Sequence, residues 1–166
     1  MDRKETTKFL GELLKRERLC GVGKYWANEV SIDYGSTDVK RIDFLQFEPV
    51  NQMSISGIEK GIFTCYEIKS CKADFKSGFG QNFIGEKNYL VMPMATYKEV
   101  ISEIPHNVGV LVPIPTHVDK YDEFENPTEL SEDVSWKLCT IISARQQNRK
   151  RSMNELLFCM LRSGQN

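Results

Sequence analysis

One short segment limits what this chain can fold into more than any other. Residues 62–69 (IFTCYEIK) begin as a continuous apolar run, as expected of a buried β-strand, and then bring in Glu67 and Lys69. Side chains alternate between the two faces of a strand, so Phe63, Cys65, Glu67 and Lys69 share one side. The segment therefore predicts a strand with a charged site at its far end.

Asp43 likewise places a charge among apolar residues, on an earlier strand. Residues 39–47 (VKRIDFLQF) alternate, and Asp43 falls on the side of Leu45 and Phe47. An unpaired carboxylate on a buried face costs several kcal/mol or is protonated. The charges of Asp43, Glu67 and Lys69 are tolerable if the three groups converge, because a divalent cation offsets the repulsion between two carboxylates. Mg²⁺ suits such a pair, since it prefers oxygen ligands and keeps several waters.

Composition indicates one globular domain. The chain has 166 residues, of which 40% are hydrophobic, enough for a single core. The formal net charge of −1 gives no support for nucleic-acid binding by the chain as a whole, so such binding would need a local patch. Five cysteines without a CxxC pair argue against a zinc site and indicate reduced thiols. With no signal sequence and no membrane-spanning run, we expect a cytoplasmic protein without a membrane contact.

The order of the predicted elements indicates an α/β fold. We expect a helix over 5–18, strands over 27–34, 39–47 and 61–69, a helical segment over 72–78, a strand over 87–93, a helix over 96–104 and a strand over 107–115. An acidic, loop-like stretch follows over 119–133, with room for a short edge strand. Two C-terminal helices complete the chain over about 131–163, the first capped at Ser131 and the second by Ser152 with Glu155 in a capping box. Together these elements predict a central mixed sheet flanked by helices.

Two motifs resemble a known superfamily. RIDF at 41–44, followed by YEIKS at 66–70, looks like the signature of the PD-(D/E)xK nucleases. Within that superfamily, EIKSCKADFKSG is similar to the MmcB-type DNA-repair proteins, and the similarity covers about residues 25–115. The resemblance implies a restriction-endonuclease-like αβββαβ core over about residues 5–115, within one domain spanning 1–166.

The resemblance also implies a function. Asp43, Glu67 and the backbone carbonyl of Ile68 would ligate Mg²⁺, for which Mn²⁺ would substitute. Lys69 would attend the nucleophilic water, and Glu29 would be an accessory carboxylate. The expected activity is hydrolysis of DNA phosphodiester bonds in DNA repair, defence or mobile-element processing. A homodimer or a partner protein would supply specificity.

Further polar residues near the motif are candidates for nucleic-acid contact. Lys72, Lys76 and Lys87 are candidates for phosphate contacts; alternatively, they belong to an ordinary solvent-exposed face. Gln81 is a further candidate for nucleic-acid contact. Asp74 is interpreted as a helix first-turn carboxylate rather than a metal-side group.

Other interpretations of the charged residues stay open. Glu67 and Lys69 could form an exposed pair at a sheet edge, and Glu29 could be an ordinary polar residue of a strand. The chain could also be a non-catalytic nucleic-acid-binding or adaptor protein with a nuclease-like fold. A third alternative is a structural protein with a buried ion-pair network.

Overall fold

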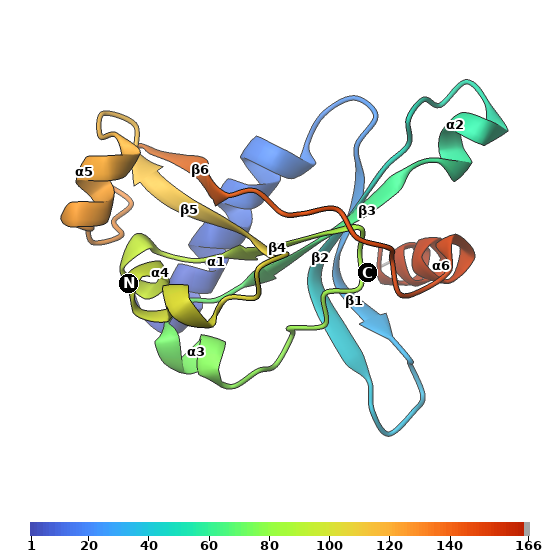
Figure 1. The fold of residues 1–166 in the computed structure, drawn as a ribbon, viewed down its shortest axis with the longest axis horizontal. Coiled ribbons are helices and arrows are strands. Elements are labelled where there is room, and N and C mark those ends of the chain that lie inside the picture. The colour runs from blue at the N-terminus through green and yellow to red at the C-terminus, as the bar shows by residue number, and fades with distance from the viewer. Residues whose placement is uncertain (165–166) are drawn as a thin grey trace.

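A six-stranded mixed sheet forms the centre of the molecule, as seen in a computed structural model that describes residues 1–164 (Figure 1). The strands are β1 (Tyr25–Ile32), β2 (Lys40–Glu48), β3 (Ile62–Ile68), β4 (Lys87–Val91), β5 (Gly109–Pro115) and β6 (Trp136–Ile142). The helices are α1 (Arg3–Leu14), α2 (Ile55–Glu59), α3 (Lys72–Lys76), α4 (Met94–Val100), α5 (Lys120–Glu125) and α6 (Met153–Ser163). A π-helical turn, Lys15–Leu19, extends α1, and a 3₁₀ turn, Ile101–Glu103, follows α4.

The strands lie in the sheet in their order along the chain. β1, β2 and β3 form an antiparallel meander, β4 and β5 continue parallel to β3, and β6 pairs antiparallel with β5. Parallel neighbours need a crossover, and the segments that contain α3 and α4 supply the two crossovers. The predicted α/β class, with a mixed sheet flanked by helices, is confirmed.

The two faces of the sheet are covered by different helices. Leu10, Leu13 and Leu14 of α1 pack on the face that carries Tyr66 and Ile68. On the opposite face, α6 packs over β1, β2 and β3, while α3 and α4 pack over β4 and β5. The spacing of three and four between the α1 leucines produces the single apolar stripe that one face of a sheet can accept.

The prediction of a helix over residues 131–151 was wrong. Residues 136–142 form β6, and 143–151 have no regular structure apart from bends at the end. Trp136 and Leu138 are buried two residues apart, and the run ends in Thr140, Ile141 and Ile142, which are β-branched. The free edge of β5 gives this run a backbone partner, so strand pairing prevails over the helical interpretation.

The remaining C-terminal predictions were partly right. α6 begins after Ser152, whose side chain accepts a hydrogen bond of 3.2 Å from the Glu155 amide. The carboxylate of Glu155 binds Arg151 at 3.1 Å, and only the Ser152 half of the predicted capping box is present. The acidic stretch holds the short helix α5 rather than an edge strand.

Side chains from elsewhere in the chain bind the outer strands. Arg16 and Arg18, in the π-helical turn, donate to the carbonyls of Trp136 and Leu138, and Glu17 accepts a 2.7 Å bond from the Leu138 amide. At the other side of the sheet, Arg162 of α6 donates to the Ser31 carbonyl of β1 at 2.7 Å. All five cysteines are free. Within residues 1–164 we find no helix with both the length and the apolar character to cross a bilayer.

Candidate metal-dependent active site

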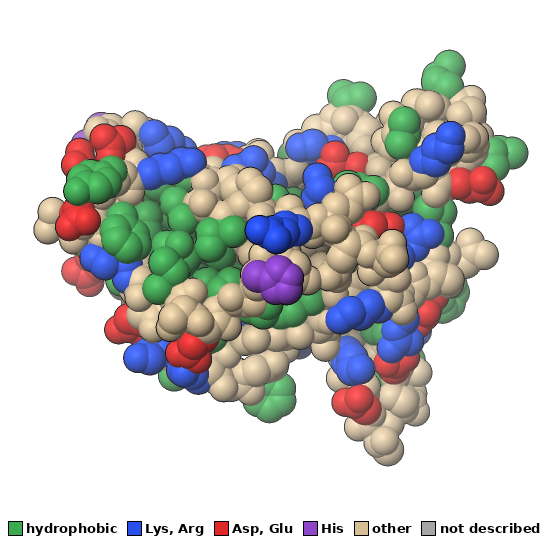
Figure 2. Space-filling view, viewed as in Figure 1, with side chains coloured by type: hydrophobic (Ala, Val, Ile, Leu, Met, Phe, Trp, Pro, Cys, Tyr) green, Lys and Arg blue, Asp and Glu red, His purple; other side chains and the backbone are tan. Residues whose placement is uncertain are grey.

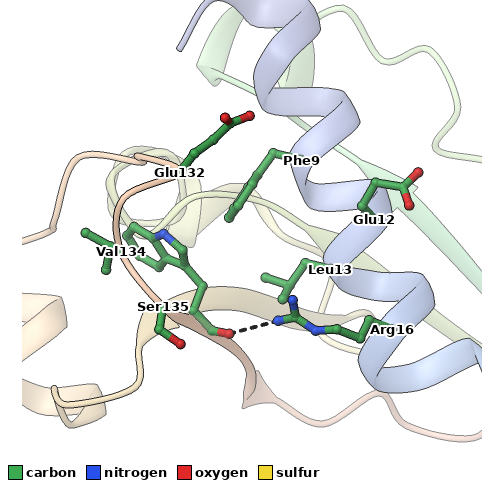
Figure 3. A pocket seen from close by; sticks show the side chains of 8 residues that line it. Phe9, Glu12, Leu13, Arg16, Glu132, Val134 and Ser135 are labelled. Atoms are coloured by element: carbon green, nitrogen blue, oxygen red, sulfur yellow. Dashed lines mark hydrogen bonds between the residues drawn. The ribbon is translucent and has the colours of Figure 1, made fainter.

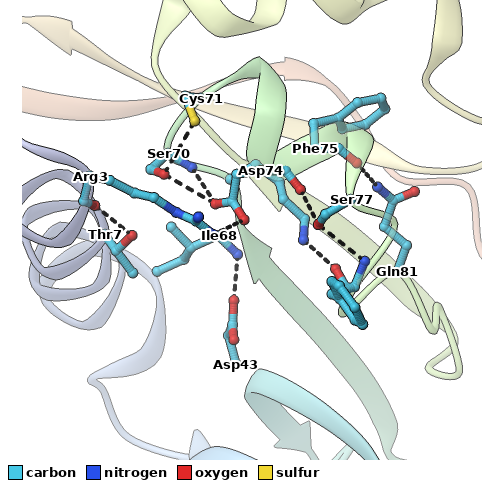
Figure 4. A network of polar contacts seen from close by, with 12 residues as sticks. Arg3, Thr7, Asp43, Ile68, Ser70, Cys71, Asp74, Phe75, Ser77 and Gln81 are labelled. Carbon is cyan, nitrogen blue, oxygen red and sulfur yellow. Dashed lines mark hydrogen bonds and ion pairs between the residues drawn. The ribbon is translucent and has the colours of Figure 1, made fainter.

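The candidate site lies where β2 and β3 separate. Backbone pairing between these strands runs as far as Phe44 opposite Tyr66. One position further, Oδ2 of Asp43 accepts a hydrogen bond of 2.8 Å from the Ile68 amide (Figure 4). A side chain thus takes the place of a backbone partner, and the Asp43 carboxylate is held at the end of β3, next to Glu67.

The alternation of side chains along β2 is interrupted at this point. Ile42 and Leu45 belong to the same apolar cluster although they are three residues apart, and Phe44 belongs to the cluster beneath α1. Strict alternation would place Ile42 and Leu45 on opposite faces. The prediction that Asp43 shares a regular strand face with Leu45 and Phe47 therefore does not hold, and Asp43 reaches Glu67 because the strands separate.

Glu67 is a buried carboxylate without a hydrogen-bond donor. Its side chain is 1% exposed, and neither oxygen receives a hydrogen bond from the described part of the chain. Burial raises the pKa of Glu67 well above its usual value, the nearby Asp43 carboxylate raises it further, and Lys69 acts in the opposite direction. A cation between Asp43 and Glu67 would counteract both causes, because its positive charge favours the ionised carboxylates.

The two other buried glutamates among residues 1–164 show how unusual a buried carboxylate without donors is in this protein. Glu123 accepts bonds from the amide and the hydroxyl of Thr128, at 2.8 and 2.7 Å. Glu86 accepts from the Phe63 amide at 2.8 Å and pairs with Arg149 at 2.7 Å. Both carboxylates are satisfied by their surroundings, as buried polar groups normally are. Glu67 is the exception, because neither of its oxygens has a donor among the described residues.

Lys69 and a glycine-containing loop complete the site. Lys69 is 3% exposed, and its Nζ donates to the backbone carbonyl of Phe79. A Cβ atom built on Gly80 would lie 2.5 Å from Oε2 of Glu67 and 3.6 Å from Nζ of Lys69. Gly78 and Gly80 have φ values of +70° and +76°, which glycine adopts without strain. The backbone of this loop can therefore lie directly against the charged pair.

A cleft of about 770 Å³ opens over these groups; we call it the β2–β3 cleft. Its lining consists of Arg3, Thr7, Ser31, Asp38, Val39, Lys40, Arg41, Asp43, Glu67, Ile68, Lys69, Asp74, Gly78, Phe79, Gly80 and Asn82. The structure thus brings Asp43, Glu67, Ile68 and Lys69 together, as expected. The cations Arg3, Lys40 and Arg41 also line the cleft; the sequence had suggested Lys40 and Arg41 only as alternative ion-pair partners of Asp43.

Asp74 is engaged by the chain itself. Its carboxylate accepts from the amide and hydroxyl of Ser70, at 3.0 and 3.1 Å, and from Arg3 at 2.7 Å (Figure 4). These bonds join the start of α3 to the start of α1 and agree with the interpretation of Asp74 as a first-turn carboxylate. Although it lines the cleft, Asp74 already has donors, in contrast to Glu67.

Glu29 does not join the site. Its side chain is exposed, lies 4.0 Å from Arg41 and falls outside the cleft lining. Its φ of +50° interrupts the regular geometry of β1 opposite Asp43. The expected role as an accessory carboxylate therefore lacks structural support. The sequence suggested it because the alternating pattern of this strand does not reveal the positive φ of Glu29.

The four residues proposed for nucleic-acid contact also lie outside the cleft lining. Lys72 is exposed, and Lys76 pairs with Glu103. Lys87 lies beside Thr64, near the start of β3, whereas the site is at its end. Gln81 donates to the Phe75 carbonyl at 2.8 Å, so it holds the loop after α3.

The ligand set is small. Within residues 1–164, no three or more His, Cys, Asp or Glu side chains are grouped so that they could hold a metal ion. Two carboxylates, with waters and a substrate phosphate, are a common environment for Mg²⁺. The unsatisfied oxygens of Glu67, next to Asp43, fit such an ion.

A second cleft, of about 450 Å³, lies between α1 and the segment before β6 (Figure 3). Phe9 and Trp136 form part of its wall, with ring centroids 6.1 Å apart and edge to face. Arg16 binds the Trp136 carbonyl at 3.0 Å, and Glu12 binds Lys15 at 2.8 Å. The third charged group, Glu132, is exposed, so among the described residues this cleft lacks the unsatisfied buried carboxylate that distinguishes the β2–β3 cleft.

Comparison with known proteins gives no assignment: no protein-family model, no curated protein and no solved structure matches the chain.

Proposed function

We propose that this protein is a Mg²⁺-dependent nuclease that hydrolyses DNA phosphodiester bonds, with an active site of the PD-(D/E)xK type. The observation that carries the proposal is the buried Glu67 carboxylate, which lacks donors and lies beside Asp43 and Lys69. The order of α1, the β1–β3 meander, α3 and β4 supports a restriction-endonuclease-like core.

Asp43 and Glu67 would hold the cation, and Mn²⁺ would substitute for Mg²⁺. The bound ion would supply an acidified water and would balance the charge that develops on the phosphodiester. The Ile68 amide fixes the Asp43 carboxylate by a 2.8 Å bond, so one ligand is oriented in advance. The carbonyl of Ile68 would be the third ligand from the chain.

Lys69 would act directly on the reacting groups. Among residues 1–164 its ammonium has one hydrogen-bond partner, the carbonyl of Phe79. A lysine has three donors, so two would remain for a water and a phosphate oxygen. A cation held at the developing negative charge stabilises the transition state of phosphoryl chemistry. Lys69 would thereby orient the water and stabilise the added charge.

Substrate binding would depend on the cations of the cleft. Figure 2 shows positive and negative side chains interspersed over the visible face, and the net charge of the chain is −1. Arg3, Lys40 and Arg41 gather beside the carboxylates, where they would hold phosphates on either side of the bond that is cut.

The decisive experiment is a cleavage assay on plasmid and oligonucleotide DNA with Mg²⁺, Mn²⁺ or EDTA. We expect metal-dependent cleavage by the wild type and a loss of about a hundredfold or more in Asp43→Asn and in Lys69→Met. Glu123→Gln, a change at a buried glutamate far from the cleft, is the matched control and should retain activity. Cleavage that survives both site substitutions would exclude this site. Binding without cleavage by the wild type would favour the non-catalytic alternative.

A further inference from the structure

We propose that Phe79 is a stacking platform for an unpaired base, so that the nuclease takes its substrate as a single strand. This inference rests on the proposed function and names the substrate class of the same site. Phe79 lines the β2–β3 cleft, yet its side chain is 81% exposed. An exposed ring on a residue that lines a charged cleft packs on little of the protein and is free to receive a flat ligand.

The loop presents this ring in a defined position. Gly78 and Gly80, on either side of Phe79, have positive φ values, so the chain turns sharply before and after it. Both ends of the loop are fixed: Ser77 donates to the Asp74 carbonyl at 2.7 Å, and Asn82 donates to the Arg41 carbonyl at 3.1 Å. The ring is therefore exposed on an anchored backbone, which lowers the entropy lost on binding.

The same residue is linked to the catalytic groups. The carbonyl of Phe79 binds Nζ of Lys69, and the adjacent Gly80 lies against the Glu67 carboxylate. A base stacked on the Phe79 ring would bring its own phosphate to the Lys69 side of the cleft. Lys40 and Arg41, which also line the cleft, would hold neighbouring phosphates of the strand.

The geometry favours single-stranded over duplex DNA. Stacking on an aromatic side chain requires an open base face, and in a duplex each base is covered by its neighbours. Stacking of this kind tolerates any sequence, because every base has a π-face. The chain would accordingly bind single strands with little sequence preference.

The test measures binding of a short, fluorescently labelled single strand by anisotropy, in Ca²⁺ and in the Asp43→Asn background so that the strand is not cut. We expect Phe79→Ala to weaken binding roughly tenfold, and Phe79→Trp to restore it. Tyr121→Ala is the matched control, because Tyr121 is an exposed aromatic (72%) on α5, away from the cleft, and should bind as the parent does.

A strand of the same length with abasic sites provides the second comparison. The parent should bind it roughly tenfold more weakly than the intact strand, and Phe79→Ala should cause no further loss, because the stacking partner is already missing. Equal binding of the intact strand by the parent and by Phe79→Ala would overturn the inference. So would an equal loss on the intact and the abasic strand, or a failure to bind any single strand.

Failure of this inference is distinguishable from failure of the proposed function. If the wild type cleaves DNA but Phe79→Ala leaves single-strand binding unchanged, the stacking role is wrong and the nuclease function stands. If the wild type cleaves nothing with Mg²⁺ or Mn²⁺, the proposed function is wrong, whatever the binding comparison gives.

Discussion

Gly80 and Glu67 are in such close contact that a Cβ atom on Gly80 would lie 2.5 Å from Oε2 of the Glu67 carboxylate. The two residues come from different parts of the chain, one from the end of β3 and one from the loop after α3. The loop backbone therefore helps to define where the Glu67 carboxylate can lie.

This contact predicts that Gly80→Ala damages the site. The new methyl group would displace either Glu67 or the loop that holds Lys69. Gly78→Ala is the matched control, because Gly78 has a similar positive φ but open space around its Cβ position. Each change should cost about 1–2 kcal/mol of stability from backbone strain. Only Gly80→Ala should also reduce the cleavage rate, by about tenfold or more. Equal rates for the two variants, measured alongside their thermal unfolding, would show that the contact is unimportant.

Glu67→Gln should stabilise the protein at neutral and alkaline pH in the absence of divalent cations. Above the ordinary glutamate pKa, the folded protein must either keep a proton on Glu67 or bury its charge without a donor beside Asp43, and the substitution removes both costs. We expect a gain of about 1–3 kcal/mol in the free energy of unfolding, measured with urea in EDTA. Glu123→Gln should instead lose stability, since its carboxylate accepts two bonds from Thr128. If Glu67→Gln were less stable than the wild type, the view that the Glu67 carboxylate destabilises the metal-free protein would be wrong.

The raised pKa of Glu67 also sets the pH dependence of stability. The folded protein keeps a proton on Glu67 at pH values where the unfolded chain has released it. Since the folded state then binds more protons, stability falls as the pH rises from the ordinary glutamate pKa through the raised pKa of Glu67. Urea unfolding across this range should give a downward trend in the wild type that is reduced in Glu67→Gln. If the free energy of unfolding changed with pH to the same extent in both proteins, Glu67 would not be the group responsible.

Mg²⁺ should raise the melting temperature of the wild type. A cation that binds the folded state alone stabilises it by about 2.7 kcal/mol at a free concentration one hundred times its dissociation constant. The cation competes with the Glu67 proton, and the shift should therefore grow with pH. Differential scanning calorimetry with Mg²⁺ and with Ca²⁺ would measure it, and Asp43→Asn should show little shift. An equal shift in that variant would place the ion elsewhere.

Arg41→Gln should weaken DNA binding similarly for all sequences. Arg41 lines the β2–β3 cleft, and a phosphate contact carries no sequence information. Removing one such contact should reduce the slope of log affinity against log salt concentration by about 0.7 for a single strand. Lys60→Gln, an exposed lysine just after α2, is the control and should leave the slope unchanged. Identical salt slopes for both variants would remove Arg41 from the binding surface.

Local sequence patterns predicted most of the fold. The first five strands and the first helix follow from strand alternation, apolar runs and helical spacing, which act over a few residues. Residues 136–142 were misassigned because a short apolar run fits either a helix or a strand, and the free edge of β5 decides between them. That edge is a nonlocal partner, which inspection of the run itself does not reveal.

The candidate site was predictable only in part. A carboxylate within one strand and a charged pair at the end of the next indicated that Asp43, Glu67 and Lys69 would meet. The contribution of the loop was missed because it is made by a backbone carbonyl and by glycines with positive φ, which leave no charge pattern. Gly78 and Gly80 were visible in the sequence as part of an irregular stretch. The single aromatic residue between them was the signal that could have pointed to this loop.

The side chains that bind the outer strands also restrict how copies of this protein can associate. The Trp136 and Leu138 carbonyls and the Leu138 amide of β6 are occupied by Arg16, Glu17 and Arg18, and the Ser31 carbonyl of β1 is occupied by Arg162. Exposed edge strands are the usual template for intermolecular β-pairing and for aggregation. Joining two copies edge to edge at these positions would first require these internal bonds to break, so they act against intermolecular strand pairing there.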